Sequence, residues 1–165
     1  MYLARIVKGD STMENTHQVF VYGTLKHGYG NYKHFLAGNS NFVGPAVSCD
    51  NRFLMRTTGY FPVAKFVSKE AYKLVGEIYN CIDDKTLARL DRLEGNGTLY
   101  NRERFYFNCT PDYKDRPDVE RYVLKSAWIY LFMQDLNEEY IVEDGIDKRL
   151  KYSKNEHGDS LVEWV

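Results

Sequence analysis

The sequence has few of the features that define stapled or metal-bound small proteins. Its 165 residues include only 3 cysteines and 4 prolines. The cysteines, at positions 49, 81 and 109, are odd in number and have no CxxC spacing. This pattern speaks against a disulfide framework or a zinc knuckle, and it favours a reducing, cytoplasmic setting.

A long hydrophobic run is also missing. The longest apolar stretch, Ala127 to Met133, is far shorter than the roughly 20 residues of a membrane-spanning helix. The segment from Met1 to Val7 lacks the apolar core of a signal peptide. We therefore expect a soluble cytoplasmic protein that has no membrane partner.

A strong net charge is absent as well. The 22 basic and 23 acidic side chains leave a net charge of −1, so no global field would attract nucleic acid. The acidic residues are concentrated between Met133 and Val165, where nine acidic side chains face only four basic ones. A solvated acidic face, or a segment docked on the mildly basic remainder, explains this asymmetry better than a nucleic-acid clamp.

Apolar side chains, by contrast, are plentiful. Hydrophobic residues make up 44% of the chain and aromatic residues 15%, enough for one folded core. Residues 1–17 are polar without periodicity and are predicted to be an N-terminal extension. Residues 18–165 contain no repeat and no linker, and they are predicted to form a single domain with an acidic C-terminal segment.

Short aromatic and β-branched segments, separated by turn residues, predict an α+β fold built on a curved sheet or small mixed β-barrel of about six strands. Asn31 to Leu36 is predicted to form a short flanking helix, and Asp135 to Val165 either wraps the barrel or frays. The predicted strands are Gln18–Tyr22, Phe42–Cys49, Arg52–Thr57, Pro62–Val67, Leu74–Cys81, Arg102–Cys109 and Tyr122–Phe132.

The clearest helix signal lies in the middle of the chain. Leu87, Leu90 and Leu93 recur at helical spacing. Asp83 is a suitable N-cap, and Gly95 supplies a stop. The sequence therefore predicts a second flanking helix that ends next to Glu94.

The turn from Tyr22 to Gly30 is a candidate anion site. A chain that leaves a strand through Gly23 can point successive backbone N–H groups the same way, which attracts a carboxylate or phosphate. The GxxxxGK[ST] and GxGxxG patterns are both absent, so nucleotide chemistry is disfavoured. A purely structural turn remains an equal alternative.

Glu94 is a candidate acid/base residue. A carboxylate at a helix C-terminus faces the negative end of the helix dipole, and burial would disfavour its charge further. Both effects raise the pKa toward the range that a general acid/base needs. The simpler alternative is an exposed surface glutamate, which is the commoner case. No histidine, cysteine or serine has the motif of a metal site or a nucleophile, so no metal is expected.

Three motifs together resemble the γ-glutamylcyclotransferase-like superfamily, and most closely its γ-glutamylamine cyclotransferase and AIG2-like branch. They are Tyr22-Gly23-Thr24-Leu25-Lys26, then Leu90-Asp91-Arg92-Leu93-Glu94-Gly95, then Tyr100-Asn101-Arg102. The resemblance spans roughly Val19 to Phe132. It implies a small β-barrel with flanking helices and a cavity that holds a γ-glutamyl group.

The resemblance also implies a reaction without a cofactor. The α-amino group of a γ-glutamyl amine or amide would attack its own side-chain carbonyl, forming 5-oxoproline and releasing an amine. Glu94 is implied as the catalytic general acid/base. The residues implied to hold the substrate or shape its cavity are Tyr22, Gly23, Thr24, Leu25, Tyr100, Arg102 and Tyr130.

Two other functions remain open at this point. The same cavity would serve a noncatalytic module that binds a small ligand, or the acidic C-terminal segment would serve a protein-interaction domain. Burial of Glu94 beside the turn favours the enzyme, whereas a solvent-facing Glu94 favours the binding module. Residues 1–17, Thr110 to Glu120 and the C-terminal segment match no motif, and they are expected to govern which leaving amine fits.

Overall fold

A computed structural model describes residues 16–110, 122–142 and 148–165. Nearly all of the predicted N-terminal extension and of the Thr110 to Glu120 connection lies outside these residues. Strand β1 begins at His17, the last residue of that extension. The predicted division of the chain into an extension and one domain stays a prediction.

The described residues form nine strands and two helices in the order β1, α2, β2 to β5, α3, β6 to β9. The helices are α2 (Gly30–Phe35) and α3 (Asp84–Glu94). The strands are β1 (His17–Val21), β2 (Asn41–Ser48), β3 (Phe53–Thr57), β4 (Pro62–Phe66), β5 (Lys73–Ile82), β6 (Tyr100–Cys109), β7 (Val123–Phe132), β8 (Leu150–Lys154) and β9 (Ser160–Trp164).

Five of these strands close into a barrel. The strands β1, β7, β6, β2 and β5 follow one another in the sheet, and β5 then pairs with β1 to complete the ring. The pairing of β1 with β7 is parallel, whereas the other four are antiparallel. The predicted small mixed β-barrel with flanking helices is thus confirmed. Its strand count differs from about six, because β3 and β4 form a separate ribbon and β8 and β9 extend the sheet beyond β5.

Closure of the barrel requires β1 and β5 to approach closely. At Gly76 in β5, a β carbon would overlap the carbonyl oxygen of Val21 and the ring of Phe20. Only glycine fits between these two strands. The Phe20 ring stacks on that of Phe107 in β6, with centroids 4.1 Å apart, and is part of the hydrophobic core.

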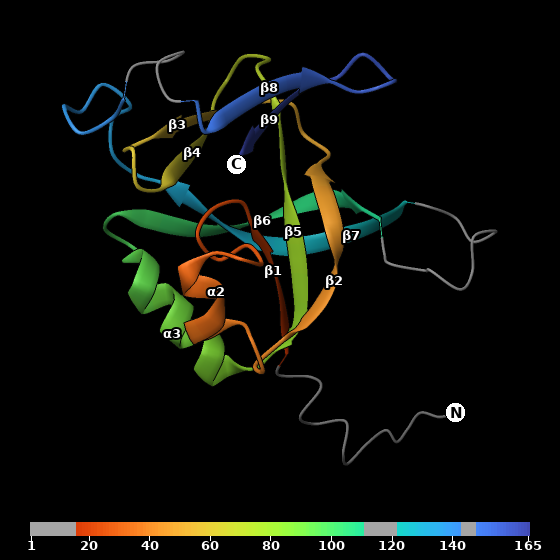
Figure 1. Ribbon diagram of the computed structural model, residues 1–165, viewed down its shortest axis with the longest axis vertical. Helices are drawn as coiled ribbons and strands as arrows, with labels where there is room; N and C mark the ends of the chain where they lie inside the picture. Colours follow the sequence, from red (N-terminus) through yellow and green to blue (C-terminus); the bar gives the residue numbers. More distant parts are fainter. Residues whose placement is uncertain (1–15, 111–121, 143–147) are drawn as a thin grey trace.

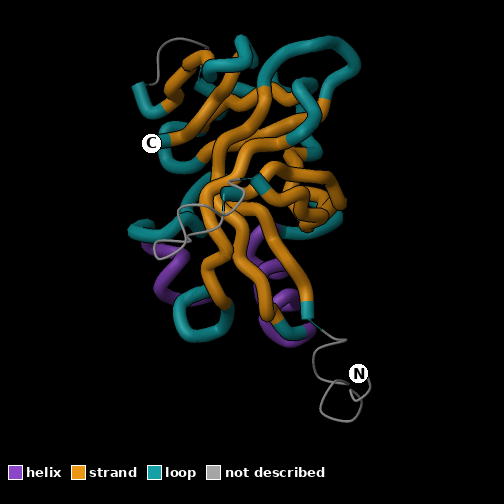
Figure 2. Tube along the Cα trace, turned by 90° about the vertical axis from the view of Figure 1, so that its right-hand side faces the viewer, coloured by secondary structure: helices purple, strands orange, loops and turns teal. Residues whose placement is uncertain are grey.

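Both helices lie at one end of the molecule, and β8 and β9 lie at the other (Figures 1 and 2). The predicted leucine stripe of α3 is split between two environments. Leu87 and Leu90 are buried against the barrel, whereas Leu93 is 36% exposed beside the cavity described below. Neither described helix is long and apolar enough to cross a membrane.

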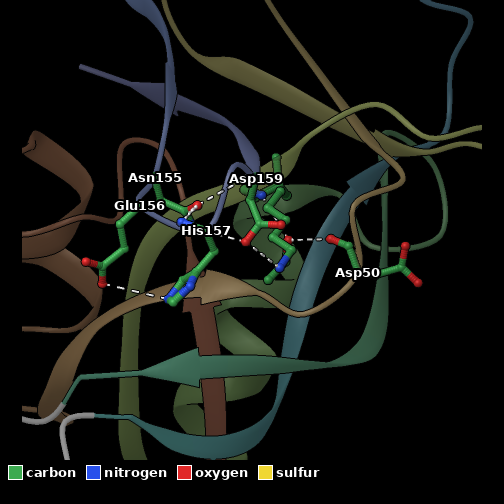
Figure 3. A network of polar contacts seen from close by, with 8 residues as sticks. Asp50, Asn155, Glu156, His157 and Asp159 are labelled. Atoms are coloured by element: carbon green, nitrogen blue, oxygen red, sulfur yellow. Dashed lines mark hydrogen bonds and ion pairs between the residues drawn. The ribbon is translucent and has the colours of Figure 1, made fainter.

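The described part of the acidic C-terminal segment folds onto the barrel as a hairpin of β8 and β9. Strand β9 runs parallel to β5, and its Val162 and Trp164 are buried in the core. At the hairpin turn, Asn155 donates to the carboxylate of Asp159 at 3.0 Å, as Figure 3 shows. Lys73 of β5 donates to the same carboxylate at 3.1 Å, which attaches the turn to the sheet.

Candidate active site

A cavity of about 270 Å³ opens beside the barrel, where the end of β1 meets the end of α3. The β3–β4 turn and residues of β6 and β7 complete its wall. Its lining residues are Phe20, Val21, Tyr22, Gly23, Thr24, Leu25, Asn31, Phe61, Pro62, Leu93, Glu94, Leu99, Tyr100 and Tyr130. Of the eight sequence-predicted site residues, all except Arg102 line this cavity.

The turn after β1 closes through its own backbone. The Lys26 N–H donates to the carbonyl of Gly23 at 2.9 Å. Within the described part of the chain, no acceptor takes a hydrogen bond from the backbone N–H of Gly23, Thr24 or Leu25. These cavity-lining groups are therefore available to an anionic ligand.

Gly23 is required for a reason that differs from the one expected. The sequence suggested backbone freedom, but its φ is not in the left-handed region. A β carbon at this position would lie 2.8 Å from Cγ of Pro62. The lack of a side chain at Gly23 thus lets Pro62, next to the β3–β4 turn, pack closely against the backbone there. We call residues Tyr22 to Leu25 the cradle.

Three tyrosines form the deep part of the wall, and each hydroxyl hydrogen is already engaged. Tyr22 donates to the carbonyl of Tyr130 at 2.6 Å, and Tyr100 donates to the carbonyl of Pro62 at 3.0 Å. Tyr130 donates to Asp91 at 2.6 Å. These bonds join β1, the β3–β4 ribbon, α3, β6 and β7 around one cavity.

Glu94 is held in the wall by the way α3 begins and ends. Asp83 caps the N-terminus by accepting from the Thr86 N–H at 2.7 Å, as the sequence predicts. Gly95 ends the helix in the left-handed conformation, with φ 61° and ψ 49°. Glu94 is consequently the last helical residue, and it is partly buried where it borders the cavity.

The environment of Glu94 favours its neutral form. Burial raises the pKa of its carboxyl from 4.5 to about 7. Of the two effects expected from the sequence, burial is the one identified as the cause. No group within the described residues donates a hydrogen bond to this carboxyl, so nothing there offsets the cost of its charge.

The tyrosine hydroxyls do not compete with Glu94 as acids. Burial raises the pKa of Tyr22, Tyr100 and Tyr130, and the nearby charge of Glu94 raises all three further. Among the described residues that line the cavity, Glu94 is therefore the one group that titrates near neutral pH.

The lining of the cavity is mainly apolar, at its rim as well as in its interior. Tyr22, Tyr100 and Tyr130 are 4–6% exposed, whereas Leu93 is 36% exposed and so lies toward solvent. Leu99, which is partly buried, also contributes to the wall. None of the described lining residues is lysine, arginine or histidine.

Arg102 is connected to the cavity wall through a neighbour. Its guanidinium donates to both carboxylate oxygens of Asp91, at 2.9 and 3.3 Å, and lies 4.2 Å from the centre of the Trp128 ring. Asp91 in turn receives the hydroxyl hydrogen of Tyr130. The resemblance implies that Arg102 shapes the site. These contacts are consistent with that role, because Arg102 binds Asp91 and Asp91 binds the cavity-lining Tyr130.

Several residues of the site were not identified from the sequence. Asp91 lies three residues before Glu94, so the two share one face of α3, and this spacing was the available signal. Asn31, whose amide donates to the Thr24 hydroxyl at 2.7 Å, was identified only as the start of the predicted short helix. Phe61 and Pro62 gave no local signal, because the folding of the β3–β4 ribbon brings them to the cavity.

These features define a class of small mixed-barrel proteins in which a cavity beside the barrel is bordered by a carboxyl with a raised pKa and by a turn whose backbone N–H groups have no acceptor among the described residues. Comparison with known proteins identifies the family. The model of the gamma-glutamyl cyclotransferase, AIG2-like family matches residues 19–147, and the chain belongs to this family. The resemblance noted in the sequence is thereby confirmed.

Individual relatives agree with this assignment. The gamma-glutamylcyclotransferase family protein YtfP of Escherichia coli is 30% identical over 128 residues, which cover 78% of this chain and 93% of the relative. Gamma-glutamylaminecyclotransferase A of Danio rerio is 35% identical over 89 residues, covering 51% and 54%. The crystal structure of an AIG2-like protein from Mus musculus has a TM-score of 0.57 at 22% identity, covering 71% of this chain and 77% of that one, and it shows the same fold.

Proposed function

We propose that this chain is a γ-glutamylamine cyclotransferase-like enzyme that converts a γ-glutamyl amine or amide to 5-oxoproline and a free amine. The α-amino nitrogen of the substrate attacks the carbonyl carbon of its own side chain. The bond from that carbon to the leaving nitrogen then breaks. One carbon–nitrogen bond forms and one is lost, so the reaction consumes no water and needs no redox partner.

The observation that carries this proposal is the Glu94 carboxyl, which borders the cavity without a hydrogen-bond partner in the described chain and has a pKa of about 7. An α-ammonium group with an ordinary pKa near 8 must lose a proton before it attacks. Ionised Glu94 accepts that proton and returns one to the leaving nitrogen. A carboxyl with a pKa near neutrality can do both in one cycle.

The cradle supplies the remaining function. Free N–H groups at Gly23, Thr24 and Leu25 are suited to bind the α-carboxylate or the developing oxyanion, because no cationic side chain lines the described wall. Holding the glutamyl chain in a folded conformation makes the attack a positioned intramolecular step. The wall tyrosines fix the shape of the cavity through hydrogen bonds that are already formed.

The rim favours a leaving group without a carboxylate. Leu93 and Leu99 offer apolar contact, and the described lining has no cation that would pair with an acidic leaving group. We therefore propose that γ-glutamyl derivatives of simple amines react faster than γ-glutamyl amino acids or glutathione.

The alternatives receive less support. A noncatalytic module fits best if Glu94 faces solvent, but Glu94 borders the cavity beside the turn. An interaction domain fits best if the acidic segment is free, but Val162 and Trp164 of that segment are buried in the core.

The test is release of 5-oxoproline by the purified protein from γ-glutamyl amines, γ-glutamyl amino acids and glutathione. Glu94→Gln is expected to keep the fold and to lose at least about a hundredfold in kcat, because glutamine cannot accept the proton. The matched control is Glu70→Gln, at an exposed position between β4 and β5, which should retain wild-type rates. Wild-type turnover by Glu94→Gln, or no release from any substrate by a folded wild-type protein, contradicts the proposal.

A further inference from the structure

Lys26 is a buried lysine for which the proposed reaction has no use. Its residue is 6% exposed, although lysine is among the side chains most rarely buried without a partner. It directly follows the cradle in the chain, yet it is not among the residues that line the cavity. Its side chain therefore lies outside the cavity.

The partners of Lys26 lie on the last strand of the sheet. The ammonium group donates to the carbonyl oxygen of Trp164 at 2.5 Å, and the Glu163 carboxylate lies 3.9 Å away. The Trp164 ring packs against Tyr29, with centroids 5.1 Å apart, and Tyr29 follows the cradle on the same loop. Burial is the largest influence on Lys26 and lowers its pKa, while Glu163 raises it. The Lys26 ammonium group thus loses solvation but gains a hydrogen bond to a backbone carbonyl oxygen.

The same residue also closes the cradle. Its backbone N–H donates to the carbonyl of Gly23, and its own carbonyl accepts from the Tyr29 N–H at 3.1 Å. Lys26 therefore contacts two parts of the structure. Its backbone closes the turn of the cradle, and its side chain joins that turn to β9. Moving the ammonium group off Trp164 would release the C-terminal end of the cradle, whose N–H groups have no acceptor among the described residues.

We propose that Lys26 is a positioning residue that fixes the substrate cradle to the C-terminal strand β9. The proposal rests on the proposed function in taking Tyr22 to Leu25 as the substrate cradle. Strands β8 and β9 lie beyond residues 19–147, the range that the family model matches. In this chain, a segment outside the matched range thus supports the binding turn within it.

Three variants separate this role from general support of the fold. Lys26→Met keeps the length of the side chain but removes its donor and charge. Lys26→Arg keeps both. Lys73→Met is the matched control, because it removes the ion pair with Asp159 at the other end of the same hairpin. Within the described residues, the printed hydrogen bond and ion pair of the Lys73 side chain involve no cradle residue.

Steady-state release of 5-oxoproline gives the first readout. Lys26→Met should raise KM about tenfold, as expected for loss of a charged hydrogen bond, and keep the acidic limb of kcat/KM near pH 7. Lys26→Arg should restore most of the affinity. Lys73→Met should lower the melting temperature with KM within about twofold of wild type. An unchanged KM in Lys26→Met, or an equal rise in Lys73→Met, overturns the proposal.

Hydrogen exchange of the amides that close the cradle turn gives a readout that does not depend on turnover. The N–H groups of Lys26 and Tyr29 donate to the carbonyls of Gly23 and Lys26, so their exchange should accelerate in Lys26→Met and stay at the wild-type rate in Lys73→Met. Unchanged exchange in Lys26→Met, or equal acceleration in Lys73→Met, overturns the proposal. If the wild-type protein releases no 5-oxoproline, the proposed function fails and the exchange data alone decide the role of Lys26. If Lys26→Met does not fold, Lys26→Gln, which is neutral and too short to replace the lysine, is measured in the same two ways.

Discussion

The ionisation of Glu94 couples the candidate reaction to the stability of the fold. Its pKa is about 7 in the folded chain but has an ordinary value of 4.5 when solvated. Between these two values the folded state binds more protons than the unfolded state, so folding becomes less favourable as the pH rises. The stabilising effect of the neutral carboxyl is complete below pH 4.5 and is lost as the pH passes 7.

We therefore expect Glu94→Gln to gain stability relative to wild type at alkaline pH. The difference between their free energies of unfolding should grow by about 1 to 3 kcal/mol from pH 4 to pH 8, since glutamine remains neutral throughout. Urea unfolding of both proteins at several pH values measures it, with Glu70→Gln as the control. A difference that stays constant with pH would show that the Glu94 carboxyl titrates normally.

At the scale of elements, the sequence predicted best where the signals are local. The N-cap Asp83, the leucine spacing and the stop at Gly95 all lie within α3, so the helix and the position of Glu94 at its end were predictable. All seven predicted strands are present within a residue or two of their expected bounds.

The elements that were missed depend on distant partners. Strand β8 has one buried residue, Leu150, followed by four exposed ones, so it lacks the alternation that predicts a strand. It forms because β9 pairs with it, and β9 is itself held by β5. The steric reason for Gly23 and the bond between Asp91 and Tyr130 likewise exist only after distant segments meet.

The contact that joins α3, β6 and β7 is expected to matter for substrate affinity. Asp91→Asn removes the charge that pairs with Arg102 and weakens the acceptor for Tyr130. We expect kcat/KM to fall about tenfold and the free energy of unfolding to fall by about 1 to 3 kcal/mol. Asp84→Asn, at the exposed start of the same helix, is the matched control. If both variants show equal activity, Asp91 has no role in shaping the cavity.

At the scale of the whole molecule, the C-terminal hairpin belongs to the core. Trp164 is 1% exposed, and the guanidinium of Arg149 lies 3.9 Å from the centre of its ring. Arg149 also donates to the carbonyl of Val165 at 2.9 Å, which fixes the end of β9. Acidic composition suggested either a solvated face or a segment docked on the rest of the chain, and the buried Val162 and Trp164 show that the hairpin part of the segment is docked.

Loss of the Trp164 side chain should therefore destabilise the entire fold. Trp164→Ala is expected to lower the free energy of unfolding by about 3 to 5 kcal/mol, the usual cost of emptying a large buried site. Val165→Ala, at a neighbouring exposed position, should change it by less than about 0.5 kcal/mol. Thermal unfolding followed by circular dichroism measures both. Similar losses in the two variants would mean that the hairpin is not part of the core.

The chain has two tryptophans, and each is linked to a different side of the cavity through neighbouring residues. Trp128 lies against the guanidinium groups of Arg102 and Arg104, both 4.2 Å from its ring centre, and Arg102 leads through Asp91 to the tyrosine wall. Trp164 accepts the Lys26 ammonium at its carbonyl. Because indole emission responds to nearby charge, variants in which phenylalanine replaces one tryptophan, and so keeps a ring in its place, would give separate fluorescence signals for the two sides. Stopped-flow mixing with a γ-glutamyl amine would then time the response of each side to the ligand, without a chemical label.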